Sequence, residues 1–158
     1  MIRVGQGFDV HALVPDRLFV VGGVTIDYHL GLAGHSDADV LVHAIIDALL
    51  GAAGLADIGQ LFPDTDLKHK NADSRELLKQ AYQLVQSHDY RLGNIDATII
   101  CESPKLANYI PEMINNIALD CQCKTNQVNI KATTTERLGF VGRSEGVAAQ
   151  AICLLDSI

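Results

Sequence analysis

Tryptophan is absent from this 158-residue sequence, aromatic residues make up only 5% of it, and proline occurs four times. Basic residues are also scarce: 12 Lys and Arg stand against 19 Asp and Glu, so the formal net charge is −7. An acidic chain is a poor match for a polyanion, which argues against a nucleic-acid partner. A small anionic ligand remains compatible with this charge, because a pocket needs only a few local cations or a metal ion.

Long apolar runs are missing as well. The longest, over residues 40–50, contains His43 and Asp47 and is far shorter than the roughly 18–20 residues of a membrane-spanning helix. Residues 1–5 lack the charged region and apolar stretch of a secretion signal, and four cysteines are too few for a disulfide scaffold. We therefore expect reduced cysteines, no membrane partner and a cytoplasmic location.

What the sequence does contain is the composition of a globular protein, with 48% hydrophobic residues. No repeat, low-complexity tract or linker divides it, which predicts a single domain over residues 1–158. Apolar, β-favouring runs predict strands over residues 2–10, 95–101, 128–135 and 146–155, and a hairpin over residues 18–28 with its turn at Gly22-Gly23.

Apolar residues at helical spacing predict two helices. Ser36, with Asp39 three residues on, resembles a capping box for a helix over residues 36–50. A second helix is predicted from residue 73 or 74 to about residue 88, with its apolar residues on one stripe.

A third helical stretch is predicted to open at Ser103-Pro104, since proline is tolerated in a first turn, and Pro111 indicates a break or a late start. Strands and helices thus interleave along the chain. The pattern predicts an α/β (α+β) fold: a two-layer sandwich in which helices cover one face of a mixed sheet.

The first cluster that can carry chemistry is Asp9-Val10-His11. Residues two apart on an extended strand point to the same side, so this carboxylate and imidazole lie together and can hold zinc. His43 is a third candidate ligand inside an apolar helix, and Asp39 and Asp47 lie within range of its second ring nitrogen. The alternatives are an ion pair at a strand end and a core histidine with satisfied hydrogen bonds.

The segment His35-Ser36-Asp37 lies where a loop meets the predicted helix N-terminus. Exposed backbone N–H groups and the helix dipole suit a phosphate there, and the simpler alternative is N-capping by Ser36. Two acidic loops follow, Asp57-Ile58-Gly59 and Phe62-Pro63-Asp64-Thr65-Asp66. They are suited to accept hydrogen bonds from sugar or polyol hydroxyls, although such composition is more often a solvated turn.

A second dense cluster, Lys131-Ala132-Thr133-Thr134-Thr135-Glu136, is followed by Arg143 in a glycine-flanked loop. Threonine hydroxyls donate to phosphate oxygens, whereas a carboxylate repels them unless a divalent cation stands between. Glu136 beside these donors therefore predicts a diphosphate clamp with Mg²⁺ or Mn²⁺, and a plain edge strand is the alternative. Gly5-Gln6-Gly7 lacks the third glycine and following helix of a dinucleotide-binding loop, so we reject that interpretation.

The motifs of this sequence, taken together and in their order along the chain, resemble those of the 2-C-methyl-D-erythritol 2,4-cyclodiphosphate synthase family. The resemblance covers essentially the whole chain. The resemblance rests on Gly7-Phe8-Asp9-Val10-His11, Gly34-His35-Ser36-Asp37-Ala38-Asp39, Asp57-Ile58-Gly59, Phe62-Pro63-Asp64-Thr65-Asp66, Ala72-Asp73-Ser74-Arg75 and residues 131–142. It implies a lyase of the non-mevalonate isoprenoid pathway. It also implies a homotrimer whose sheets face the threefold axis and whose active sites lie between neighbouring subunits.

The resemblance further implies roles for individual residues. Asp9, His11 and His43 match the family's Zn²⁺ ligands, and Glu136 matches a residue that holds a second divalent ion, Mg²⁺ or Mn²⁺, with Lys131 or Thr134 assisting. The positions that match substrate contacts are Asp57 and Gly59 at the ribose; His35, Ser36 and Asp64 at the erythritol phosphate, with Phe62 nearby; and Pro104, Lys105, Ala132 and Thr133 at the cytosine and phosphate side across the interface. A central channel near Phe8, Phe140 and Arg143 would take an isoprenoid diphosphate.

The implied reaction converts 4-diphosphocytidyl-2-C-methyl-D-erythritol 2-phosphate to the 2,4-cyclodiphosphate, as its 2-phosphate attacks the β-phosphorus and CMP leaves. No protein nucleophile is needed, in keeping with a sequence that offers no Ser–His–Asp or Cys–His constellation. Two other interpretations stay open: a metal-dependent phosphohydrolase of a nucleotide-linked substrate, and a non-catalytic interaction module with a structural metal. Structural zinc normally has four protein ligands, and only three candidates are found, which favours an open catalytic position.

Overall fold

A mixed five-stranded sheet forms one layer of the protein, for which a computed structural model describes residues 1–67 and 72–158. Its strands, in spatial order, are β4 (Gly31–Leu32), β1 (Ile2–Val14), β7 (Gly146–Ser157), β5 (Tyr90–Ile100) and β6 (Val128–Thr133). β5 and β6 pair in parallel and the other neighbours are antiparallel. β2 (Phe19–Val21) and β3 (Val24–Ile26) form the predicted hairpin apart from this sheet.

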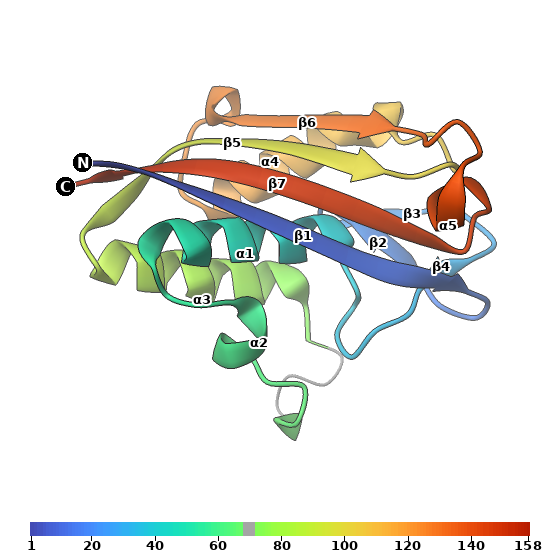
Figure 1. The fold of residues 1–158 in the computed structure, drawn as a ribbon, viewed down its shortest axis with the longest axis horizontal. Helices are drawn as coiled ribbons and strands as arrows, with labels where there is room; N and C mark the ends of the chain where they lie inside the picture. The colour runs from blue at the N-terminus through green and yellow to red at the C-terminus, as the bar shows by residue number, and fades with distance from the viewer. Residues whose placement is uncertain (68–71) are drawn as a thin grey trace.

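The second layer consists of the long helices α1 (Val40–Ala53), α3 (Ser74–Ser87) and α4 (Ile110–Asp120), which lie on one face of the sheet (Figure 1). Two single-turn helices, α2 (Ile58–Leu61) and α5 (Gly139–Gly142), lie in connecting loops. The predicted two-layer α+β architecture is therefore confirmed. No helix among the described residues has the length and apolar character needed to cross a membrane.

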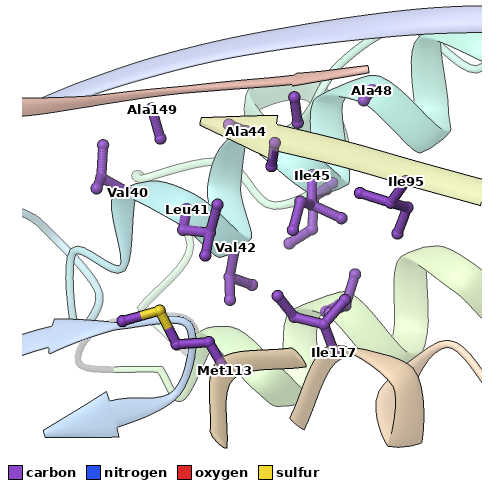
Figure 2. Close-up of a cluster of buried hydrophobic side chains, with 14 of the residues drawn as sticks. Val40, Leu41, Val42, Ala44, Ile45, Ala48, Ile95, Met113, Ile117 and Ala149 are labelled. Atoms are coloured by element: carbon purple, nitrogen blue, oxygen red, sulfur yellow. The ribbon is translucent and has the colours of Figure 1, made fainter. Parts of the chain in front are cut away.

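Alternating exposure along β1 places Gly5, Gly7, Asp9 and His11 on the sheet face that the helices cover. A Cβ on Gly7 would lie 1.9 Å from the carbonyl oxygen of Ala44, so only glycine lets α1 approach the strand this closely. Figure 2 shows Ala44 and Ala48 of α1 close to the strands, and Val42 on the side of the helix that faces Met113 and Ile117 of α4. The glycines rejected as a phosphate loop thus set the distance between β1 and α1.

Asp39 caps α1, so the prediction that Ser36 caps it was wrong. The Asp39 carboxylate accepts hydrogen bonds from the N–H of Val42, at 3.1 Å, and from Gly22 and Gly23 in the β2–β3 turn, at 2.9 and 2.7 Å. It is completely buried. A carboxylate that satisfies three backbone donors at once outcompetes a hydroxyl for the cap, and the helix therefore begins at Val40.

The third helix also begins later than the predicted start at Ser103-Pro104. Ser103 and Pro104 are joined by a cis peptide bond and lie in a loop, and α4 starts at Ile110 with Pro111 in its first turn. Backbone N–H groups in the first turn of a helix have no acceptor within the helix, so proline, which has no N–H, loses no hydrogen bond there. Pro111 is therefore compatible with the start of α4. The late start, one of two readings of Pro111, is confirmed.

The sheet face opposite the helices carries a row of exposed apolar side chains. They are Ile2, Val4, Phe8 and Val10 on β1 and Ile152 on β7, with 44–66% of each residue exposed. Isolated apolar residues are normal on a surface, whereas a row along two paired strands makes this face a candidate interaction surface.

Candidate metal site and substrate cavity

Three potential metal ligands converge where β1 passes α1. Asp9 Oδ2 lies 2.8 Å from His11 Nε2 and 3.1 Å from His43 Nδ1, and the two ring nitrogens are 3.3 Å apart. Of the residues in 1–67 and 72–158, only these three form a group of His, Cys, Asp or Glu with metal-ligand spacing. The predicted convergence is confirmed, and no fourth side chain of these types completes the group.

The hydrogen bonding of His11 shows that this group fits a cation. Its Nδ1 lies 2.7 Å from the carbonyl oxygen of Ala33, which can only accept, so Nδ1 carries the hydrogen and the neutral ring has its lone pair on Nε2. That lone pair faces the carboxylate of Asp9. Two electron-rich atoms at 2.8 Å repel each other unless a metal ion or a proton lies between them. The triad can therefore hold a divalent metal.

The pKa values of Asp9 and His11 reflect this arrangement. Burial acts against the charged form of each group, but the hydrogen bonds of Asp9 with His11 and His43 lower its pKa to about 2. Its carboxylate in turn raises the pKa of His11, although burial opposes this. In the metal-free chain the triad thus retains a proton to higher pH than a free imidazole. Because a metal ion must displace that proton, metal affinity falls as the pH falls.

The second ring nitrogen of His43 has different partners from those predicted. Its Nε2 lies 2.9 Å from the hydroxyl of Ser74 and 3.1 Å from that of Ser36. Asp39 is occupied as the cap of α1, and Asp47 accepts a hydrogen bond from the first backbone N–H of α2, at 2.7 Å. The prediction that these two carboxylates orient His43 was therefore wrong, since each is committed to backbone donors.

A cavity of about 290 Å³ opens beside the triad. It brings together all four residues predicted around the erythritol phosphate. Its lining consists of Asp9, His11, Gly34, His35, Ser36, His43, Ile58, Gly59, Phe62, Asp64 and Leu77. His35 Nε2 is buried and has no hydrogen-bond partner among the described residues. Asp57 is not part of this lining; it caps α2 by accepting from the N–H of Gln60, at 2.9 Å.

The N-terminus of α1 does not provide the phosphate site predicted for residues 35–37. The Asp39 carboxylate already accepts from the N–H of Val42 at this helix end, and both Asp39 and Val40 are completely buried. The side chains of His35 and Ser36, rather than the helix end, therefore face the cavity.

The residues predicted as the diphosphate clamp and cytosine pocket lie elsewhere in the chain. A second cavity of about 230 Å³ is lined by Cys101, Glu102, Pro104, Lys105, Leu106, Ala107, Ala132, Thr133 and Thr134. Exposed Glu136 follows it, and its N–H donates to Thr134 Oγ1, at 3.2 Å. Lys131 forms an ion pair with Asp96, at 2.6 Å. None of these residues lines the cavity beside the triad.

The residues predicted near a central channel also lie apart from both cavities. Phe8 is on the open sheet face, Phe140 is 43% exposed on α5, and Arg143 pairs with Glu145, at 2.7 Å.

Sequence reasoning missed Arg17 and the roles of Asp37 and Ser74. The guanidinium of Arg17 donates to the carbonyl oxygens of Gly34, at 3.2 Å, and Ser36, at 2.9 Å, and so fixes the loop that carries His35. No local pattern marks Arg17, because its partners lie 17 and 19 residues away. Asp37 and Ser74 lie within two of the motifs that carry the family resemblance, and this resemblance is the sequence signal that could have marked them.

The fold and the triad define an α+β protein in which three side chains could hold a metal ion beside a cavity. Comparison with known proteins then gives the family. The YgbB family model matches residues 2–156, and the chain belongs to this family.

Relatives match over nearly the full chain. The 2-C-methyl-D-erythritol 2,4-cyclodiphosphate synthase of Enterococcus faecalis is 59% identical over 156 residues, 99% of both chains. Among solved structures, bifunctional IspDF from Campylobacter jejuni is 49% identical with a TM-score of 0.96, covering 100% of this chain and 43% of that one. Plasmodium falciparum IspF, in a CDP complex, is 33% identical with a TM-score of 0.87, covering 99% of this chain and 96% of that one.

Proposed function

We propose that this chain, acting as a single domain over residues 1–158, converts 4-diphosphocytidyl-2-C-methyl-D-erythritol 2-phosphate to 2-C-methyl-D-erythritol 2,4-cyclodiphosphate and CMP. The observation that carries the proposal is the triad of Asp9, His11 and His43, whose ligand atoms converge beside a cavity without a fourth ligand among the described residues. The names of the relatives support the same reaction. The proposed pathway is non-mevalonate isoprenoid synthesis, and the proposed compartment is the cytoplasm, where unpaired cysteines stay reduced.

In this reaction the new bond joins an oxygen of the 2-phosphate to the β-phosphorus. The bond between that phosphorus and the bridging oxygen breaks, and CMP leaves with the oxygen and the electron pair. Asp9, His11 and His43 would hold Zn²⁺, which when bound supplies Lewis-acid polarisation of a phosphoryl oxygen. The work of the protein is to position an internal nucleophile and to stabilise charge, so no protein nucleophile takes part.

The cavity residues would bind the sugar half of the substrate. His35 Nε2, which has no hydrogen-bond partner in residues 1–67 or 72–158, and the Ser36 hydroxyl are suited to hydrogen-bond the erythritol 2-phosphate and hold it toward the triad. Asp64 would accept from an erythritol hydroxyl, and Phe62 would pack against the carbon skeleton. Asp57 and the backbone at Gly59 would bind the ribose hydroxyls.

The cytidine half would be bound by a neighbouring subunit of a homotrimer. Pro104, Lys105, Ala132 and Thr133 form a cavity away from the triad, so a second copy can supply it while the first supplies the metal site. The exposed apolar row on the open sheet face supports burial of that face at a threefold axis. The channel along the axis, beside Phe8, Phe140 and Arg143, would take an isoprenoid diphosphate.

A second divalent ion, Mg²⁺ or Mn²⁺, would be held by Glu136 against the diphosphate. This carboxylate is exposed and so is free to meet a partner subunit's substrate. Thr134 would donate to a phosphate oxygen, and Lys131 would assist only after its ion pair with Asp96 opens.

Product analysis in ¹⁸O-labelled water tests the proposed reaction. The protein, loaded with Zn²⁺ and Mg²⁺, is expected to release CMP and cyclic diphosphate in equal amounts, seen as two coupled resonances in the ³¹P spectrum. Cyclisation takes no oxygen from water, so neither product should carry ¹⁸O. A chelated sample is the control and should leave the substrate intact. An open bisphosphate that contains one solvent oxygen would contradict the proposal and identify a phosphohydrolase.

A further inference from the structure

A loop carboxylate next to the metal site fixes the direction of a buried hydroxyl. Asp37 Oδ1 accepts a hydrogen bond from the Asp39 N–H, at 3.1 Å, and one from the hydroxyl of Ser74. Its Oδ2 accepts from the Ser74 N–H, at 3.0 Å. An ionised carboxylate only accepts, so the hydroxyl hydrogen of Ser74 points to Asp37.

The Ser74 oxygen is then left as an acceptor for His43. It lies 2.9 Å from His43 Nε2, so Nε2 must carry the hydrogen of that bond. A neutral imidazole has one N–H, and the lone pair is therefore on Nδ1. Nδ1 is the atom that faces Asp9 and His11. Ser74 is completely buried at the start of α3, which shields this chain of bonds from water.

We propose that Asp37 and Ser74 are positioning residues that fix the tautomer of His43, so that its Nδ1 is unprotonated and available to the metal. The inference rests on the metal site of the proposed function, but it does not depend on which reaction follows. The Ala33 carbonyl sets His11 in the same way from the other side. Each ring thus has its N–H held by an acceptor and its lone pair turned to the triad.

The opposite tautomer is a real competitor in this site. With hydrogen on Nδ1, His43 would donate to Asp9 Oδ2, only 3.1 Å away, and the ring would block the metal position. Ser36 does not decide between the two, because its hydroxyl accepts from the Ala38 N–H, at 3.2 Å, and no described carboxylate directs its hydrogen. Ser36 can therefore donate to Nε2 as readily as accept from it. Ser74, held by Asp37, removes that choice.

Zinc binding by Ser74→Ala, measured without substrate, tests the inference. We expect its zinc affinity to fall by about 10- to 100-fold, the usual cost of losing a partner of a metal-bound histidine. In mildly alkaline, metal-free buffer, ¹⁵N spectra of labelled histidines should show the hydrogen of His43 on Nε2 in the unmutated chain and largely on Nδ1 in the variant. Ser87→Ala is the matched control, because it removes a hydroxyl at the far end of α3, and both readouts should stay unchanged.

The two readouts together decide the outcome. A Ser74→Ala protein with unchanged zinc affinity and an unchanged tautomer would overturn the inference, as would a loss of affinity without a change of tautomer. If this variant does not fold, Asp37→Ala, which frees the Ser74 hydroxyl to donate to His43, carries the same test. Normal zinc binding and tautomers in an unmutated chain that forms no cyclic product would contradict the proposed function alone.

Discussion

Replacing His43 with alanine is expected to slow CMP release by about a thousandfold or more. The change removes one of three ligands, and the remaining pair, Asp9 and His11, cannot hold an ion against competing water and protons. Stabilisation of phosphoryl charge by a metal contributes several kcal/mol, and about 4 kcal/mol corresponds to a thousandfold in rate. Asp9→Ala should have a comparable effect. Initial rates of CMP release at saturating substrate, with Zn²⁺ and Mg²⁺ in excess, measure it.

Two controls separate loss of the site from loss of the fold. His88→Ala removes an exposed histidine at the end of α3 and should keep the unmutated rate. The unmutated protein should also melt cooperatively after chelation, because a catalytic metal does not hold the fold together. CMP release from His43→Ala at the unmutated rate would contradict the role of the triad, and collapse on chelation would favour a structural metal module.

Replacing Gly7 with alanine is expected to destabilise the protein by about 3 kcal/mol or more. The added methyl group would meet backbone atoms of α1, 1.9 Å from the carbonyl oxygen of Ala44 and 2.9 Å from the nitrogen of Ala48. Backbone cannot rotate away as a side chain can, so the helix must shift from the sheet, at the upper range of overpacking costs. Since α1 carries His43 and β1 carries Asp9, zinc affinity should fall as well. Urea unfolding measures the stability.

Gly51→Ala, on the same helix, is the matched control for Gly7→Ala. The nearest atom to a Cβ at Gly51 is the Gln6 carbonyl oxygen, 3.9 Å away, so the methyl group makes only an ordinary van der Waals contact. Alanine in a helix interior is expected to stabilise the protein by about 0.5–1 kcal/mol relative to glycine. Equal urea midpoints for Gly7→Ala and the unmutated chain would show that α1 does not depend on this close approach.

The three candidate metal ligands could be predicted because each signal is local. Alternation along an extended strand places Asp9 and His11 on one side, whatever the rest of the chain does. An imidazole within an apolar helix demands a partner, which singled out His43. Their convergence followed from the family resemblance, and the contact of β1 with α1 confirms it.

The partners of those ligands could not be predicted, because they come from segments far apart in the sequence. Ser74 meets Asp37 across 37 residues, and nothing in either motif indicates the other. The cap of α1 was misassigned for a related reason. Ser36 and Asp39 both suit an N-cap, and the choice depends on the hairpin turn at Gly22-Gly23, which supplies Asp39 with two more donors.

The second cavity and the segment that follows it illustrate a different limit. Ala132 and Thr133 in that cavity and Glu136 after it belong to a pattern typical of phosphate binding, yet they do not line the cavity beside the triad. The types of residue along a sequence indicate chemistry, but they do not show which segments come together at one site. The alternation along β1 is that of any half-exposed strand, so only the pairing of β1 with β7 shows that its exposed apolar residues and Ile152 share one face.

Zinc anomalous scattering from crystals grown with Zn²⁺ tests the central claim most directly. The account predicts one strong peak within about 2.0–2.2 Å of His11 Nε2, His43 Nδ1 and a carboxylate oxygen of Asp9, with its fourth position open to the cavity. A peak at another place, or an ion at the triad closed off by a fourth protein side chain, would contradict it.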